Sequence, residues 1–515
     1  MNNKFYNEIF YIIFLLFFYS SISFYYALDH INSHWTAVYD DELTLVYNAL
    51  LYNSGIEQEY TDHSGYFTIL FTSIYLKVLN FFGIIEIYKF SQIQELDLNQ
   101  LFKNSIYHMR VLSIFVSAVY LISATYLFNI LFKNKLFSFL LGVILFFLYG
   151  NLILLSGVRT EQFSGLFLML SLIGLFNFFE KNRLIFLIMF LFCLFCSILN
   201  KSQVIYHLPL ILLYSFYVNK KPISFNINLE SIPRKNKILL YIYIFLFTFL
   251  TLKSLIFLRD YKTWIFLIII LFFLNYFFLR LSNQKKIIDN LLIFNSTIIF
   301  SYIIFNLIIF LHPSASLNSL ENTIFAVVNR TVVYRPEIAD ATFINFVIGL
   351  MKTIPQNFIL LFDKFFLSIN SYSIILISSI VIFFINFKNY QSNDKKIITL
   401  LSISFFGIYF INLIRGDNSY YYIFIDYIFI IFLGFVLKNL YKQISLGFLI
   451  LSICLVFYFN IFPDNKKNQF FRNNDIALKT HEQYSNKSKE LCDNPVYFTS
   501  WHMRIPISKF EEFCY

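Results

Sequence analysis

The chain has 515 residues, of which 58% are hydrophobic and only 14% carry a charge. Soluble globular domains have about 25% charged residues, so this composition excludes that class and predicts a polytopic helical membrane protein. The formal net charge is +10, but most basic residues lie in short segments between apolar runs. Because such residues orient membrane spans, we expect membrane lipids around the chain and no nucleic-acid partner.

Apolar runs long enough to cross a bilayer recur along the chain. We predict an all-α transmembrane bundle of about 13 spans, with a transmembrane domain at residues 1–462 and a short outer tail at 463–515. The predicted spans are residues 9–28, 107–132, 136–156, 162–179, 184–199, 203–218, 238–258, 263–281, 290–311, 368–387, 397–414, 419–437 and 444–462. The first run is long for a cleaved signal peptide, so we expect it to remain as a span.

The basic residues favour one orientation of this bundle. With the N-terminus in the cytoplasm, nearly every basic cluster falls on the cytoplasmic side, as the positive-inside rule requires. The clusters are Lys133/Lys135, Lys181/Arg183, Lys220–Lys237, Arg280–Lys286, Lys388–Lys396 and Lys438/Lys442. We therefore expect a multi-pass protein of a bacterial inner (plasma) membrane, with its N-terminus in the cytoplasm and its C-terminus outside.

The loop after the first span, residues 29–106, is acidic, and between Lys4 and Lys77 the chain contains no Lys or Arg. Such a loop belongs on the outer side of the membrane. The apolar stretch at residues 66–87 has Lys77 in its middle, and a full crossing there would move the later basic clusters outside. We therefore expect residues 29–106 to form one outer loop that contains interfacial or re-entrant helices.

The same topology places several isolated charges on the outer side, together with a second long outer loop at residues 312–367. A phosphate group held at the outer face would explain the cations, because Arg and Lys form charge-assisted hydrogen bonds to phosphate oxygens. Each residue also has a simpler explanation: Arg110 can anchor its span by snorkelling, and Arg159 can form a local ion pair with Glu161. Lys201 has no carboxylate near it in the sequence, which favours a functional role.

Short motifs follow one another in a set order at the outer ends of these spans. They are Asp40-Asp41-Glu42 in the first loop, Asp62-His63-Ser64-Gly65 before the next apolar helix, Arg110, Arg159-Thr160-Glu161, Asn200-Lys201-Ser202-Gln203, and Arg415 followed by Tyr421. This order resembles the GT-C membrane glycosyltransferases, in particular the protein O-mannosyltransferase and aminoarabinose transferase branch. The chain departs from that branch at Ser64, where His-Pro is usual, and at Ser202-Gln203, where Gly-Pro is usual.

The resemblance implies an enzyme that moves a sugar from a polyprenyl-phosphate donor to a hydroxyl of a glycan, lipid or protein acceptor, usually with inversion. A carboxylate must take the proton of the attacking hydroxyl. Asp41 matches the family's catalytic residue, and the adjacent Asp40 and Glu42 are alternatives, although acidic residues also favour a helix start. The residues implied in binding lipid phosphate or substrate are Arg110, Arg159, Glu161, Lys201, His63, Arg415 and Tyr421, of which His63 also suits a structural role.

Two other classes of function fit a polytopic chain. A lipid-linked oligosaccharide polymerase or ligase would use outer arginines but would not need Asp-Glu directly after the first span. A lipid or glycan flippase should place charges inside its spans. The sequence contains no P-loop, dinucleotide or metal-ligand pattern, so we expect no nucleotide cofactor, and a divalent metal has no support. Cys492 and Cys514 share the predicted outer tail, where a disulfide is permitted.

Overall fold

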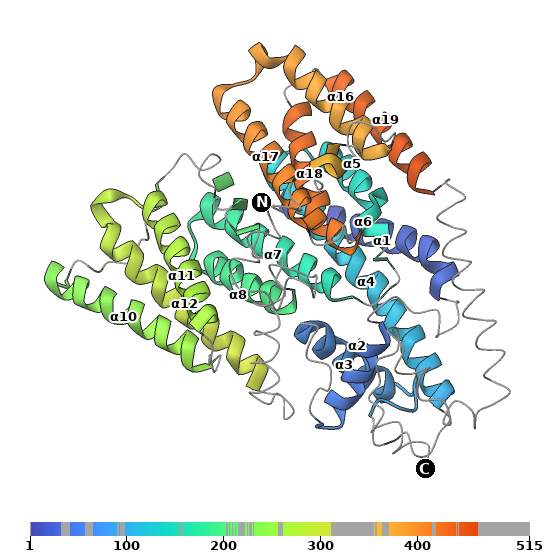
Figure 1. The fold of residues 1–515 in the computed structure, drawn as a ribbon, viewed down its shortest axis with the longest axis horizontal. Helices are drawn as coiled ribbons and strands as arrows, with labels where there is room; N and C mark the ends of the chain where they lie inside the picture. The colour runs from blue at the N-terminus through green and yellow to red at the C-terminus, as the bar shows by residue number, and fades with distance from the viewer. Residues whose placement is uncertain are drawn as a thin grey trace.

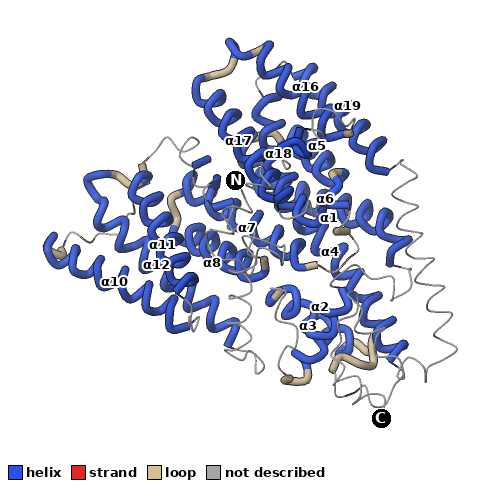
Figure 2. The backbone as a smooth tube through the Cα atoms, viewed as in Figure 1, coloured by secondary structure: helices blue, strands red, loops and turns tan. Residues whose placement is uncertain are grey.

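The structure is a computed structural model of the whole chain. It describes residues 2–31, 42–56, 65–89, 92, 98–152, 154–155, 157, 159–201, 204, 207–208, 210–211, 213–214, 222–223, 225, 229, 231–255, 261–310, 355, 358–362, 370–414, 419–438, 440 and 442–461. Within these ranges the fold is all helical, and the only β-type pairing is a single bridge between Ile223 and Ser282 (Figure 2).

The helices form a bundle (Figure 1). Their bounds are α1 Asn2–Ile31, α2 Glu42–Asn53, α3 Tyr66–Phe81, α4 Leu98–Phe132, α5 Lys135–Phe147, α6 Tyr149–Leu152, α7 Thr160–Lys181, α8 Leu184–Asn200, α10 Arg234–Leu255, α11 Tyr261–Leu281, η3 Gln284–Lys286, α12 Ile287–Phe310, α16 Ser371–Ile385, η5 Phe387–Asn389, α17 Ser392–Ile414, η6 Ser419–Tyr422, α18 Ile423–Leu437 and α19 Lys442–Ile461. Most predicted apolar runs therefore coincide with a helix.

One predicted span is interrupted. Within the predicted span 136–156, the helix α5 ends at Phe147, because Leu148 has an extended conformation with ψ 147°. The short helix α6 follows, which gives the chain a break inside an apolar segment. Such a break frees backbone groups that a neighbouring element must satisfy.

The described residues contain five helices that are long and apolar enough to cross a membrane. They are Tyr6–Leu28, Asn104–Phe132, Thr160–Lys181, Gln284–Ile304 and Ser392–Leu413, and seven shorter apolar helices of 10–17 residues accompany them. The helix α3 has 16 residues, or about 24 Å of rise, which is less than the roughly 30 Å hydrocarbon core. The total of about 13 spans stays a prediction.

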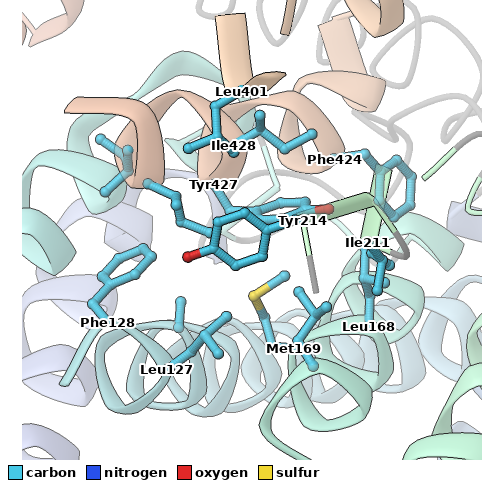
Figure 3. Close-up of a cluster of buried hydrophobic side chains, with 14 of the residues drawn as sticks. Leu127, Phe128, Leu168, Met169, Ile211, Tyr214, Leu401, Phe424, Tyr427 and Ile428 are labelled. Atoms are coloured by element: carbon cyan, nitrogen blue, oxygen red, sulfur yellow. The ribbon is translucent and has the colours of Figure 1, made fainter. Parts of the chain in front are cut away.

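The core lies around α7 and α18. In the α7 span, 83% of the 18-residue apolar window is buried inside the protein. The corresponding share for the α1 span is 17%, and most apolar side chains of α1 are exposed. Every side chain of α18 is buried. Figure 3 shows Tyr427 of α18 packed between this helix and the helices that carry Leu127 of α4 and Met169 of α7. An apolar helix covered on all sides must lie at the centre of its bundle.

One end of the bundle gathers basic loops. Lys135 contacts Glu8 at 2.9 Å, and Lys133 contacts Glu180 at 3.2 Å. These ion pairs bring together the start of α1, the end of α4 and the end of α7. The end of α18 lies beside them, since the rings of Phe132 and Phe435 are 5.2 Å apart. All these segments are ones that the sequence predicts on the cytoplasmic side.

Candidate functional site

At the opposite end of the bundle, the start of α7 meets the end of α8 and the start of α18. The helices α7 and α8 form an antiparallel pair, and Gly174 lets them approach closely, because a Cβ there would lie 2.8 Å from the backbone nitrogen of Phe190. The pairing brings the residues just outside α7 and α8 to the same point. Three charged side chains meet at this point.

Glu161 is the centre of this charged group. Its carboxylate lies 2.8 Å from the Lys201 Nζ and 3.3 Å from the Arg159 Nε. Glu161 has no exposed surface, and Arg159 and Lys201 are also buried. Arg159 is the extended residue before α7, and Glu161 lies in the first turn, where the helix dipole stabilises a carboxylate. Among the described side chains, two cations therefore contact one carboxylate.

The sequence alone suggests that Lys201 is a cation without a nearby carboxylate. The contact with Glu161 corrects this interpretation. Lys201 follows α8 in an extended conformation, which aims the end of its side chain at the start of α7. Its ammonium contacts Glu161 and also lies 3.2 Å from the Thr160 hydroxyl. The carboxylate was not visible in the sequence because it comes from the neighbouring helix of the pair.

Asn200 ties a third helix to the same point. Its side-chain amide donates to the Thr160 carbonyl at 2.6 Å, and its carbonyl accepts from the Thr68 backbone N–H at 3.0 Å. Thr68 belongs to the first turn of α3, so α3 is fixed against the charged group. Both Asn200 and Thr68 are fully buried, and buried polar groups with complete partners make a rigid arrangement.

The aromatic ring of Tyr421 in η6 also lies beside Lys201. The ammonium lies 5.4 Å from the centre of the Tyr421 ring. A cation at this distance from an aromatic face gains about 0.5–2 kcal/mol, the higher values applying when the pair is desolvated. The late span that carries Tyr421 therefore contacts a lysine from the first half of the chain.

A second buried ion pair lies near the first group. Arg110 of α4 donates from Nε to one Glu42 oxygen at 3.1 Å and from Nη2 to the other at 3.1 Å. Glu42 is the first residue of α2, and neither side chain is more than 1% exposed. One helical turn after Arg110, Ser113 donates to Gln162 at 2.7 Å, and Gln162 is the neighbour of Glu161. The two charged groups therefore lie at the same level of the bundle.

The structure thus brings together six of the residues that the sequence selected. They are Glu42, Arg110, Arg159, Glu161, Lys201 and Tyr421. The other selected residues, Asp40, Asp41, His63 and Arg415, lie outside the described residues, as do Cys492 and Cys514. In the sequence, Asp40 and Asp41 directly precede Glu42.

Sequence analysis missed one buried carboxylate. Asp426 lies in the first turn of α18 with no exposed surface. It accepts a hydrogen bond from the Tyr372 hydroxyl and another, at 3.4 Å, from the Asn151 amide. A signal was present, because an ionisable residue inside an apolar run is itself an indication of function.

The fold and the charged group define a class of protein. In its described part, the chain is an all-helical protein with several helices that can span a membrane and a buried charged cluster at one end. No group of three or more His, Cys, Asp or Glu side chains suited to a metal occurs among the same residues. Comparison with protein-family models, with curated proteins and with solved structures gives no match in any of the three.

Proposed function

We propose that this protein is a membrane glycosyltransferase that moves a sugar from a polyprenyl-phosphate donor to a hydroxyl acceptor at the outer membrane face. The observation that supports this proposal is the meeting of charged residues from separate helices at one buried point, opposite the basic end of the bundle. Loops at the basic end match the predicted cytoplasmic side, so the charged group would face outward. An outer site that contains Arg and Lys side chains suits a lipid phosphate.

In this proposal Asp41 is the general base. A sugar acceptor has a weakly nucleophilic hydroxyl, and a carboxylate within hydrogen-bond reach must remove its proton as the oxygen attacks the anomeric carbon. Glu42 suits this role less well, because both of its oxygens already accept hydrogen bonds from Arg110. The buried pair instead anchors the start of α2 to α4.

Arg159 and Lys201 are proposed to neutralise the phosphate of the donor. When the sugar leaves, negative charge develops on the lipid phosphate, and preorganised cations stabilise that charge. Glu161 holds both cations in place in a buried setting, where an isolated cation would be costly. Tyr421 keeps the Lys201 ammonium in position through its ring.

The test begins with the products in the cell. Mass spectrometry of lipid A, glycoproteins and surface glycans from cells with and without this protein should show one sugar that depends on it. Wild-type protein should restore that sugar, whereas Asp41→Asn protein present at the same level should not. An unchanged set of glycans in cells lacking the protein would rule out the proposed function.

One observation favours a flippase as the second candidate. Asp426 lies inside an apolar helix, as transporters often require of a residue on a substrate path. The two functions differ in liposomes that contain a polyprenyl-phosphate sugar and the purified full-length protein. A transferase consumes the donor only when an acceptor is present, whereas a flippase exposes the donor on the other leaflet without breaking its glycosidic bond.

A further inference from the structure

Asp426 occupies a site that the proposed chemistry does not use. Its carboxylate accepts hydrogen bonds from the Tyr372 hydroxyl and the Asn151 amide. These donors come from α16 and from α6. In the described part of the chain, no Lys or Arg forms an ion pair with Asp426. The carboxylate is therefore held by neutral donors from two other elements.

Gly150 lies at the break after α5 and beside Asp426, since a Cβ on Gly150 would be 2.7 Å from one carboxylate oxygen of Asp426. Gly150 also lies against the junction of η6 and α18, where a Cβ would be 2.6 Å from the Tyr422 Cβ and 2.7 Å from the Ile423 backbone nitrogen. A side chain at position 150 would therefore displace this junction. Only glycine lets the two backbones approach so closely.

Tyr421 is the residue before this junction. Its ring faces Lys201 at 5.4 Å, and Tyr422 and Ile423, which follow it, are the residues in contact with Gly150. The Tyr120 hydroxyl donates to the Ile423 carbonyl at 3.3 Å and holds the other side of the junction. The position of the Tyr421 ring thus depends on how the junction is held.

We propose that Asp426 is a positioning residue, which clamps α6 onto the start of α18 and so sets the Tyr421 ring against the Lys201 ammonium. The link from Asp426 to activity rests on the proposed function, but the clamp itself is a structural statement with its own test. Asp426 does not touch the proposed substrate. It acts through Tyr421.

The clamp is tested by ¹⁹F NMR of full-length protein in detergent, with 3-fluorotyrosine in place of Tyr421. Lys201→Met provides the reference resonance for a ring that has lost its cation. We expect Asp426→Leu to move the resonance toward this reference. Asp394→Leu is the matched control, because Asp394 is a buried carboxylate paired with Lys438 at the opposite end of the bundle, and it should leave the resonance unchanged.

A second variant covers the case in which Asp426→Leu does not fold. Gly150→Ala keeps the carboxylate but displaces the junction, and we expect the same direction of resonance shift. A wild-type resonance in a folded Asp426→Leu protein, or in a folded Gly150→Ala protein if Asp426→Leu does not fold, would overturn the clamp. These spectra need no turnover, so they separate the clamp from the proposed function.

Kinetics then connect the clamp to the site. Loss of a desolvated cation–π contact should lower kcat/KM for the lipid donor by about 2- to 30-fold. In a Tyr421→Leu background, Asp426→Leu should have no further effect, because both changes remove the same interaction. Additive effects would show that Asp426 does not act through Tyr421. A wild-type protein without any transfer would refute the proposed function and leave the spectroscopic result standing.

Discussion

Lys201, Glu161 and Arg159 show what a buried charge requires at the scale of single residues. Each ion is costly to remove from water, and the cost is recovered only with close partners and complete hydrogen bonding. The 2.8 Å and 3.3 Å contacts to Glu161 supply a close partner for both cations. Two cations beside one carboxylate suit a site that receives an anion, whereas the contact between Arg110 and Glu42 joins one cation to one carboxylate.

The assignment of the base leads to a prediction about two neighbouring carboxylates. Asp41→Asn should lower transfer from the lipid-linked sugar by about 10² to 10⁴, the usual contribution of a general base. Asp40→Asn should retain most activity. Purified variants are compared by single-turnover transfer and by thermal unfolding, which should be unchanged. If Asp40→Asn is inactive and Asp41→Asn is not, the base is Asp40, and full activity of both would exclude a catalytic role for this segment.

Because Arg110 and Glu42 form a buried ion pair, we predict that replacing Arg110 lowers the free energy of unfolding and does not merely remove a membrane anchor. Arg110→Ala leaves the buried Glu42 carboxylate without its guanidinium and should destabilise the protein by about 3–5 kcal/mol. The double variant Arg110→Met with Glu42→Leu should recover much of this loss. The exposed pair Lys133–Glu180 supplies the control, since Lys133→Ala should change stability by less than about 1 kcal/mol.

Unfolding of the detergent-solubilised proteins measures these differences. Equal stability of Arg110→Ala and wild type would mean that the pair contributes nothing, and would return Arg110 to the role of a snorkelling anchor or a phosphate ligand.

At the scale of elements, the site depends on how closely the helices α7 and α8 approach each other. Among the described helices, α7 and α8 are the most extensively paired, and Arg159, Glu161 and Lys201 lie at their shared end. Gly174 lies in their interface, against the backbone of Phe190. Without a strong hydrophobic drive between helices in lipid, small residues at such contacts supply the close packing.

The packing at Gly174 gives a prediction with an internal control. A Cβ at this position would lie 2.8 Å from a backbone nitrogen and 3.0 Å from the Phe186 carbonyl oxygen. Gly174→Ala should therefore destabilise the protein by about 1–3 kcal/mol. It should also weaken binding of the lipid donor, because a shift of α8 displaces Lys201 at its end. Gly407 in α17 has nothing within 4 Å of its Cβ position, so Gly407→Ala should stabilise by about 0.5–1 kcal/mol. Equal effects of the two changes on unfolding would contradict the packing argument.

At the scale of the whole molecule, two ends of the bundle differ in their charges. The basic end holds Lys133, Lys135 and Lys438 with their acidic partners, and the other end holds the candidate site. Basic loops remain in the cytoplasm during insertion, so the candidate site should face outward. This orientation is necessary for a donor that is used at the outer face.

The orientation can be measured by labelling single cysteines with an impermeant thiol reagent in intact cells. Cysteines at Glu86 and Asn104, both exposed in the structure, should react, because they lie in the predicted outer loop. Cysteines at Arg183 and Lys388, equally exposed, should react only after the membrane is opened. The background protein has Cys492 and Cys514 replaced by serine. Labelling of Arg183→Cys in intact cells would reverse the topology, and protection of Glu86→Cys would show that residues 66–87 cross the membrane.

Local composition alone determined the helical class of this protein and the positions of most of its helices. An apolar run of about 20 residues must satisfy its backbone internally in lipid, and only a helix does this within one segment. For this reason the predicted span 184–199 coincides with α8, and 263–281 with α11. The order of the motifs also selected Arg159, Glu161 and Lys201 as candidate site residues, without showing that Lys201 contacts Glu161.

Only the tertiary structure decided which charges are partners. The carboxylate beside Lys201 comes from α7, and the one beside Arg110 comes from α2. The break at Leu148 and the burial of Asp426 likewise depend on contacts between α6 and α18. A hydropathy profile depends only on the residues of one segment, whereas the energy of a buried charge is set by atoms within about 4 Å. Those atoms belong here to a different helix from the one that carries or adjoins the cation.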